Sequence, residues 1–191
     1  MGNQDHAEAP DAVSIARSVD EPAVFAELFE RHFSLVYRFL TLRAGEQSAS
    51  DLAAETFVIA FRRRADYDVT RSNARPWLLG IAANLAREQH RSERRRQETV
   101  LRLTRERPAD SEEDALKRDD AGASSEKLRA ALAELVPEER DLLLLFACVG
   151  LSYGEIAEAL SLPLGTVRSR IHRLRHKLRG RLSPPAQEVR A

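Results

Sequence analysis

Residues 151–179 contain the pattern that most narrows the folds open to this chain. Ser152 and Glu155 have the S-x-x-E spacing of a capping box, in which each side chain satisfies a backbone amide at the start of a helix. A short turn at 161–163 then precedes four apolar residues at steps of four, three and four: Val167, Ile171, Leu174 and Leu178. This spacing predicts the buried edge of a second helix. A short helix joined by a tight turn to a longer one predicts a helix-turn-helix, whose second helix leaves one side free for the DNA major groove.

The free side of that second helix is basic. Between Leu164 and Leu182 every Asp, Glu, Lys or Arg position is a cation. Arginine can pair with the edge of guanine, while hydroxyl groups and other cations can hold phosphates. We therefore predict DNA contacts from Thr166, Arg168, Ser169, Arg170, His172, Arg173 and Lys177. The alternative is a solvated cationic helix that packs on an acidic neighbour.

The remainder of the chain also has helical periodicity. Apolar residues between positions 25 and 40 recur at steps of three and four, a second helix is expected from about Ser50, and Pro76 is suited to open a third. Gly and Pro number only 8 each. We therefore predict an all-α protein of two small helical domains joined by a flexible acidic linker.

Shifts in composition give the expected limits of these domains. We predict a disordered tail at 1–19, a first domain at 20–97 and an acidic linker at 98–124. A second domain at 125–182 and a disordered tail at 183–191 complete the chain.

Composition excludes several classes of function. Lys plus Arg and Asp plus Glu are both 30, so the chain is not basic throughout, and DNA binding must come from local charge. The single cysteine, Cys148, excludes an intramolecular disulfide and a multi-cysteine zinc site. His172 and His176 have the spacing of a metal pair, but no acid lies near them in the helix. The common nucleotide and zinc motifs are absent as well, so we expect no enzyme activity, no cofactor and no metal.

No segment of the sequence has the features of a membrane span or an export signal. The longest apolar run, 142–149, is too short to cross a bilayer, and the start of the chain lacks a basic and then apolar leader. We expect a cytoplasmic protein with no direct membrane insertion.

Three segments together resemble bacterial RNA polymerase sigma factors of the sigma-70 family, in its extracytoplasmic-function (ECF) group. DLAAETFVIAFRR resembles the helix of region 2 that binds the polymerase clamp, and RPWLLGIAANLAREQHRSERRR resembles the helices that melt and read the −10 element. The segment from LAELVPEERD to RLRHKLR resembles region 4, which reads the −35 element.

The resemblance implies roles for individual residues. It implies polymerase contacts from Asp51, Leu52, Glu55 and Phe57. It implies contacts with −10 DNA from Arg71, Ser72, Asn73, Trp77, Asn84, Arg87, His90, Arg91 and Arg94. Trp77 has a second interpretation as a core residue. The chain departs from the family pattern at Ala54 and Glu88, and at Ser161, where a glycine is common in the turn.

The function that the resemblance implies is that of a sigma factor. Such a protein binds core RNA polymerase and directs promoter-specific initiation by recognising −10 and −35 DNA. The expected partners are core RNA polymerase, promoter DNA and an anti-sigma factor. The alternative is a helix-turn-helix transcriptional regulator that is not a polymerase subunit.

Overall fold

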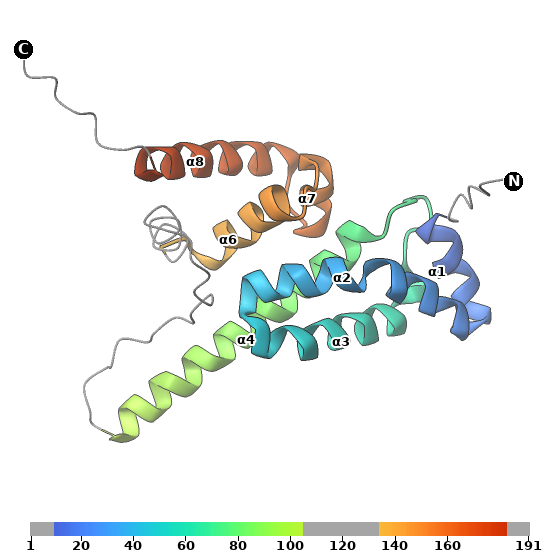
Figure 1. The fold of residues 1–191 in the computed structure, drawn as a ribbon, viewed down its shortest axis with the longest axis horizontal. Helices are drawn as coiled ribbons and strands as arrows, with labels where there is room; N and C mark the ends of the chain where they lie inside the picture. Colours follow the sequence, from blue (N-terminus) through green and yellow to red (C-terminus); the bar gives the residue numbers. More distant parts are fainter. Residues whose placement is uncertain (1–9, 105–133, 183–191) are drawn as a thin grey trace, which may run out of the picture. The chain divides into compact units, whose positions relative to one another are not determined.

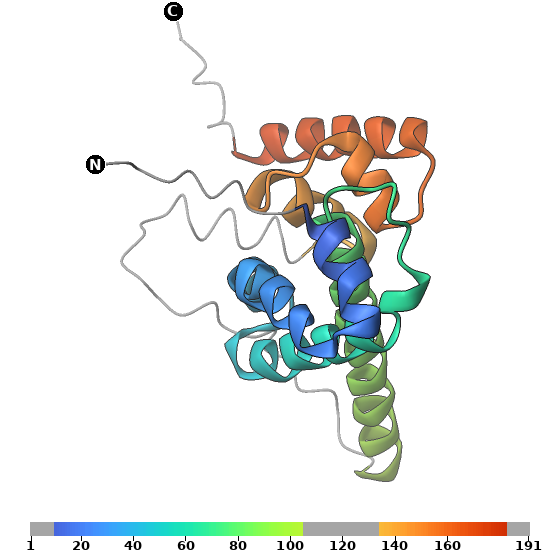
Figure 2. The same cartoon turned by 90° about the vertical axis from the view of Figure 1, so that its right-hand side faces the viewer.

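The computed structural model describes residues 10–104 and 134–182. Within these two ranges the regular structure is helical throughout, with turns between the helices and no strand, which confirms the predicted all-α class. The chain divides into two compact units, one formed mainly by residues up to Glu88 and the other mainly by those that follow. Figure 1 and Figure 2 show the helices in two perpendicular views.

The first unit is built around a hairpin of two helices. α2 (Phe25–Ala44) and α3 (Glu46–Arg62) are joined by the single residue Gly45, whose φ of 84° lies in the left-handed region that glycine tolerates. The unit also contains α1 (Asp11–Asp20), α4 (Arg75–Thr104) and two short 3₁₀ turns, Pro22–Val24 and Arg64–Asp66. Its core is apolar and includes the buried residues Ile15, Leu28, Val36, Phe39, Leu40, Leu52, Phe57 and Leu78.

The helix α1 (Asp11–Asp20) corrects the prediction of a disordered tail at 1–19 from residue 11 onward, whereas residues 1–9 lie outside the described residues. Its buried side chains are mostly small or polar, and the one large apolar side chain among them is Ile15, which is fully buried. Val13 and Val19 lie exposed instead. Apolar periodicity therefore could not reveal this helix, because much of its attachment to the unit is polar.

A second correction concerns the end of α4, which continues to Thr104 rather than stopping near residue 97. The first residues of the predicted linker are thus helical. Gln, Glu and Arg favour helix, and side-chain pairs four residues apart support it, as between Gln89 and Glu93 or Arg94 and Glu98. The rest of the predicted linker, with the start of the predicted second domain, falls at 105–133, outside the described residues, as does the predicted tail at 183–191.

The second unit contains α6 (Pro137–Leu143), α7 (Tyr153–Ala159) and α8 (Leu164–Leu182). α6 passes without a break into a π-helical turn at Leu144–Cys148. The backbone amide of Val149 accordingly donates to the carbonyl of Leu144, five residues back, at 3.0 Å. The core of the unit includes Leu142, Leu145, Leu151, Ile156, Val167 and Ile171.

The start and end of α7 follow the sequence signals closely. The Glu155 carboxylate accepts from the Ser152 amide at 2.8 Å, and the Ser152 hydroxyl accepts from the Glu155 amide at 3.3 Å, which confirms the capping box. After α7 the chain turns through Ser161, whose φ is 52°. A serine here occupies a conformation in which its Cβ is crowded by the backbone.

The turn at Ser161 generates a stability prediction. Ser161→Gly removes the crowded Cβ and is expected to raise the free energy of unfolding of the second unit by about 1 kcal/mol. Native-state hydrogen exchange at the Ile171 amide should then slow by about fivefold. As a control, Ser169→Gly within α8 should speed the same exchange, because glycine weakens a helix interior. Equal or faster exchange in Ser161→Gly would show that the turn is not strained.

Candidate functional site

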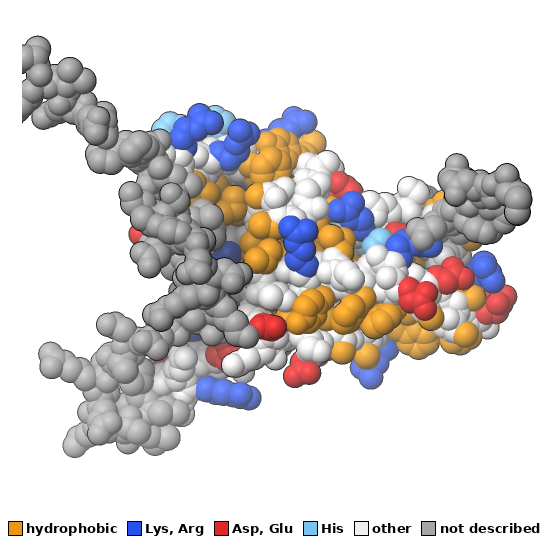
Figure 3. Space-filling model, viewed as in Figure 1, with side chains coloured by type: hydrophobic (Ala, Val, Ile, Leu, Met, Phe, Trp, Pro, Cys, Tyr) orange, Lys and Arg blue, Asp and Glu red, His pale blue; other side chains and the backbone are white. Residues whose placement is uncertain are grey.

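The helix α8 has one buried edge and a broad polar face. Val167, Ile171, Leu174 and Leu178 are all buried, which confirms the predicted edge. The period of an α-helix places Ser169, His172, Arg173 and His176 opposite that edge, and all four are exposed. Figure 3 shows the Lys, Arg and His side chains gathered along α8. The helix thus presents a basic surface of a kind that fits a nucleic-acid groove.

The predicted DNA contacts on α8 do not all lie in the same environment. Arg168, His172 and Arg173 are exposed, whereas Thr166 and Arg170 are half-buried beside the core edge. The ammonium of Lys177 lies 3.6 Å from the carboxylate of Glu139 on α6. Lys177 therefore lies on the flank of the helix that faces α6, away from the centre of the exposed face.

The helix α3 presents an acidic face with an apolar end. Asp51 and Glu55 are exposed one turn apart, as a binding role requires. Leu52 and Phe57, in contrast, are only 6% and 5% exposed and belong to the core. The large apolar side chain that shares the exposed face is Val58, at 47% exposure. Sequence reasoning missed Val58, although it follows Asp51 and Glu55 at the helical spacing of seven and three residues.

The loop at 67–74, between α3 and α4, is held by its own side chains. The Asp68 carboxylate accepts from the Thr70 hydroxyl at 2.6 Å, from the Thr70 amide and from Arg71 Nε, each at 3.1 Å. These contacts, led by the Thr70 hydroxyl, lower the pKa of Asp68. The phenol of Tyr67 donates to the Arg71 carbonyl at 2.8 Å, which closes the loop across its base.

The predicted −10 residues of this loop differ in how they are held. Arg71 and Ser72 are exposed, whereas the Asn73 side-chain oxygen accepts from the Arg75 amide at 3.0 Å and so caps the start of α4. Trp77 is half-buried, and its ring lies 4.9 Å from that of Tyr67. Burial, followed by the charge of Asp11, raises the pKa of Tyr67 to about 12, so its phenol remains a hydrogen-bond donor.

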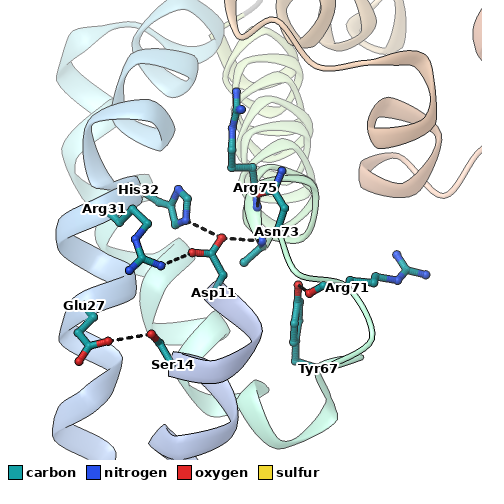
Figure 4. Close-up of polar contacts among 10 residues, drawn as sticks. Asp11, Ser14, Glu27, Arg31, His32, Tyr67, Arg71, Asn73 and Arg75 are labelled. Atoms are coloured by element: carbon teal, nitrogen blue, oxygen red, sulfur yellow. Dashed lines mark hydrogen bonds and ion pairs between the residues drawn. The ribbon is translucent and has the colours of Figure 1, made fainter. Parts of the chain in front are cut away.

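A buried carboxylate connects this loop to α1. Asp11, at the first position of α1, accepts from His32 Nε2 at 2.9 Å, from the Ala74 amide at 2.8 Å and from the Arg31 guanidinium (Figure 4). Burial alone would raise the pKa of Asp11. Hydrogen bonds from His32, the Ala74 amide and Arg31 outweigh burial and lower that pKa to about 2. Sequence reasoning missed this group, because nothing in the local pattern marks Asp11.

The predicted −10 residues of α4 lie mainly on one side of the helix. Steps of three and four residues place Asn84, Arg87, Arg91 and Arg94 along one face of the helix. Arg87 donates to the Asn84 side-chain oxygen at 2.8 Å and to the carbonyl of residue 83 at 3.2 Å, so its guanidinium is oriented. His90 is half-buried on the flank of this face.

The described ranges contain neither a candidate metal site nor a candidate membrane span. Residues 10–104 and 134–182 contain no group of three or more His, Cys, Asp or Glu placed to hold a metal ion. No described helix is long and apolar enough to cross a membrane.

Comparison with known proteins places the chain in a family. Residues 28–96 match the family described as sigma-70 region 2, and residues 125–178 match sigma-70 region 4. The two matches together span more than half of the 191 residues. They occur in the order that the sequence predicts.

Curated relatives and a solved structure agree with these matches. The ECF RNA polymerase sigma factor SigE of Mycolicibacterium smegmatis is 37% identical over 85% of this chain, which spans 63% of SigE. The sigma factor CarQ of Myxococcus xanthus is 34% identical, with 86% of this chain and 92% of CarQ covered. The structure of CnrH, solved with the cytosolic domain of CnrY, is 26% identical with a TM-score of 0.64 and covers 90% of this chain and 96% of that one.

The two matched regions define the chain as a member of the sigma-70 family. Its relatives place it, within that family, among the ECF RNA polymerase sigma factors.

The environment of Asp11 generates a prediction on pH. In the folded protein the pKa of Asp11 is about 2, below the ordinary 3.8. The ionised carboxylate therefore stabilises the fold fully above pH 3.8, and this stabilisation is lost as the pH falls through 2. Asp11→Asn should lower the free energy of unfolding at neutral pH by about 2 kcal/mol. The difference in the free energy of unfolding between Asp11→Asn and wild type should vanish as the pH falls through about 2, where Asp11 is protonated. Urea unfolding followed by the fluorescence of Trp77, the only tryptophan, reports on this unit. A difference independent of pH would contradict the assignment.

Proposed function

We propose that this protein binds core RNA polymerase and directs promoter-specific initiation by recognising −10 and −35 DNA. The observation that carries the proposal is the presence, in one chain, of regions 2 and 4 of the family together with the exposed basic face of α8. The protein acts by binding, in the cytoplasm, and the polymerase supplies the chemistry of RNA synthesis. We further propose that the second functional domain has the limits expected from the sequence, 125–182. The first domain extends beyond its expected limits of 20–97, because α1 docks before it and α4 continues to Thr104.

The exposed face of α3 is the proposed polymerase-binding surface. Asp51 and Glu55 supply charge that selects a basic partner, and Val58 supplies apolar contact beside them. Leu52 and Phe57 contribute indirectly, because their burial fixes the orientation of the helix that carries these groups. The two carboxylates would steer the approach of the polymerase, and Val58 would form a small contact from which water is excluded.

Region 4 is proposed to read the −35 element through α8. Residues near the start of a recognition helix lie closest to the base edges, so Arg168 and Ser169 are the candidates for sequence reading. His172 and Arg173, one turn further on, suit phosphate contacts. Thr166 and Arg170 border the core edge, and Lys177 contributes charge at the flank where it pairs with Glu139.

Region 2 is proposed to open and hold the −10 element. The exposed Arg71 and Ser72 present polar groups to an unstacked base, while Asn73 fixes the end of their loop. Trp77 continues this surface as the half-buried partner of Tyr67. The adjoining face of α4 supplies cations and amides for the strand: Asn84, Arg87, His90, Arg91 and Arg94.

An anti-sigma factor is proposed as a further partner. CnrH, which shares this fold at 26% identity, was solved with the cytosolic domain of CnrY. The same class of partner would occupy exposed surfaces of this chain and compete with the polymerase. An ordinary helix-turn-helix regulator is not favoured, because residues 28–96 match region 2 rather than a separate sensor domain.

Reconstitution with bacterial core polymerase tests the proposed function. Transcripts made from genomic DNA should start at discrete sites that share two upstream motifs, and these starts should be absent without the protein. Specific duplex binding by the protein alone, without association with core polymerase, would instead support the regulator.

The acidic face of α3 generates a prediction on polymerase binding. The double variant Asp51→Lys, Glu55→Lys should bind core polymerase at least about tenfold more weakly, because like charges meet at the interface. Its folding should be unchanged, since both side chains are exposed. Asp20→Lys is the control, because it also replaces an exposed acid by lysine but lies at the end of α1, outside this face. It should bind core polymerase normally. Normal binding by the double variant, measured by fluorescence anisotropy, would exclude this face.

The start of α8 generates a prediction on sequence preference. Arg168→Ala should cost about 1–3 kcal/mol in promoter binding and relax the preference at one −35 position. Lys177→Ala should weaken all sequences alike and reduce the salt slope by about one. Both are measured with holoenzyme on a set of promoters that differ at single −35 positions. If Arg168→Ala weakens all of them equally, Arg168 contacts phosphate only.

A further inference from the structure

The loop at 67–74 is attached at its far end to the first residue of α1. Oδ2 of Asp11 accepts from the backbone amide of Ala74 at 2.8 Å, and the same oxygen accepts from His32 on α2. The second oxygen, Oδ1, contacts the Arg31 guanidinium. One carboxylate therefore joins α1, α2 and the last residue of the loop, as Figure 4 shows.

We propose that Asp11 is a positioning residue for the loop that receives the unstacked −10 base. The inference rests on the proposed function, because that function gives the loop its ligand. Asp11 lies more than fifty residues from the loop in sequence and does not touch DNA in this scheme. It acts through Ala74, the neighbour of the capping residue Asn73.

The bond from Ala74 is one that water cannot easily replace. Ala74 is fully buried, and the Asp11 side chain is only 6% exposed. Removal of the carboxylate leaves a buried amide without its acceptor, which costs more than the loss of an exposed hydrogen bond. The end of the loop is then expected to move toward solvent, carrying Asn73 and the exposed Ser72 with it.

The rest of the loop does not need Asp11 to stay compact. Asp68 binds Thr70 and Arg71, and the Tyr67 phenol binds the Arg71 carbonyl. The loss of Asp11 should therefore release the end of the loop at 72–74, while residues 67–71 keep their own bonds. The released end would present Ser72 in the wrong place for a base, without a general loss of structure.

The docking of α1 itself has other supports. Ile15 is fully buried, and the Ser14 hydroxyl donates to Glu27 on α2 at 2.7 Å. At the other end of α1, Arg64 Nε donates to the Ser18 carbonyl at 3.0 Å. These contacts offer a matched control, since Ser14→Ala removes a polar bond between α1 and α2 that does not involve the loop.

The first measurement compares Asp11→Ala with Ser14→Ala in holoenzyme of the full chain. Open-complex formation on a duplex promoter should fall by about tenfold in Asp11→Ala, which corresponds to about 1.4 kcal/mol. Affinity for a single-stranded −10 oligonucleotide should fall similarly. Binding to core polymerase should be unchanged. Ser14→Ala should open the duplex promoter at a rate within about twofold of wild type, because the bond that it removes does not involve the loop.

A second measurement does not depend on transcription. Trypsin cleaves after arginine, and Arg71 is exposed within the loop. Cleavage between Arg71 and Ser72, identified by the masses of the fragments, should be several-fold faster in Asp11→Ala than in wild type or Ser14→Ala. This readout reports the order of the loop in the free protein.

The outcomes separate the inference from the proposed function. Equal cleavage at Arg71 in all three proteins overturns the positioning role, even if wild type opens promoters normally. Equal losses of opening in Asp11→Ala and Ser14→Ala overturn it too, because they indicate general destabilisation. If wild type fails to open any promoter, the proposed function fails, whereas faster cleavage in Asp11→Ala would still establish the link between Asp11 and the loop.

Discussion

The bonded carboxylate of Asp11 is the contact that ties α1 and the loop before α4 to the hairpin of α2 and α3. Burial works against its charge, and the donors His32, Arg31 and the Ala74 amide overcome that penalty together. They come from α2 and from the loop before α4, so the charge is stable only while these segments and α1 are assembled. The same interaction thus couples the docking of the first helix to the position of the loop proposed to hold −10 DNA.

The surfaces proposed for binding share one construction. In both α3 and α8 a buried apolar edge fixes the rotation of the helix, and the charged residues on the opposite side are thereby held in a defined direction. The signs are opposite: α3 exposes Asp51 and Glu55, whereas α8 exposes only cations and histidines among its titratable groups. A total charge of zero is therefore compatible with two surfaces of opposite charge, which suits the proposed binding of both a polymerase and DNA.

Much of the second unit could be predicted from sequence because its signals are local. The capping box at Ser152 and Glu155 and the buried edge from Val167 to Leu178 need only helical geometry, and both were confirmed. The first unit was less predictable. The family motif named Leu52 and Phe57 as contact residues, but a motif does not show which way a side chain points. Packing against α2 turned both inward and left Val58 exposed.

The sequence by itself determined the helical class, the helix-turn-helix and the location of the basic surfaces, because each follows from residues three or four positions apart. Only the tertiary structure decided that residues 11–20 form a docked helix, that α4 extends to Thr104 and that Asp11 holds Ala74. In the case of α1 the reason is physical. A short helix with one large buried apolar residue has little stability alone, and it gains that stability from partners such as Arg31, His32 and Ala74, which lie 20 to 63 residues away in the chain.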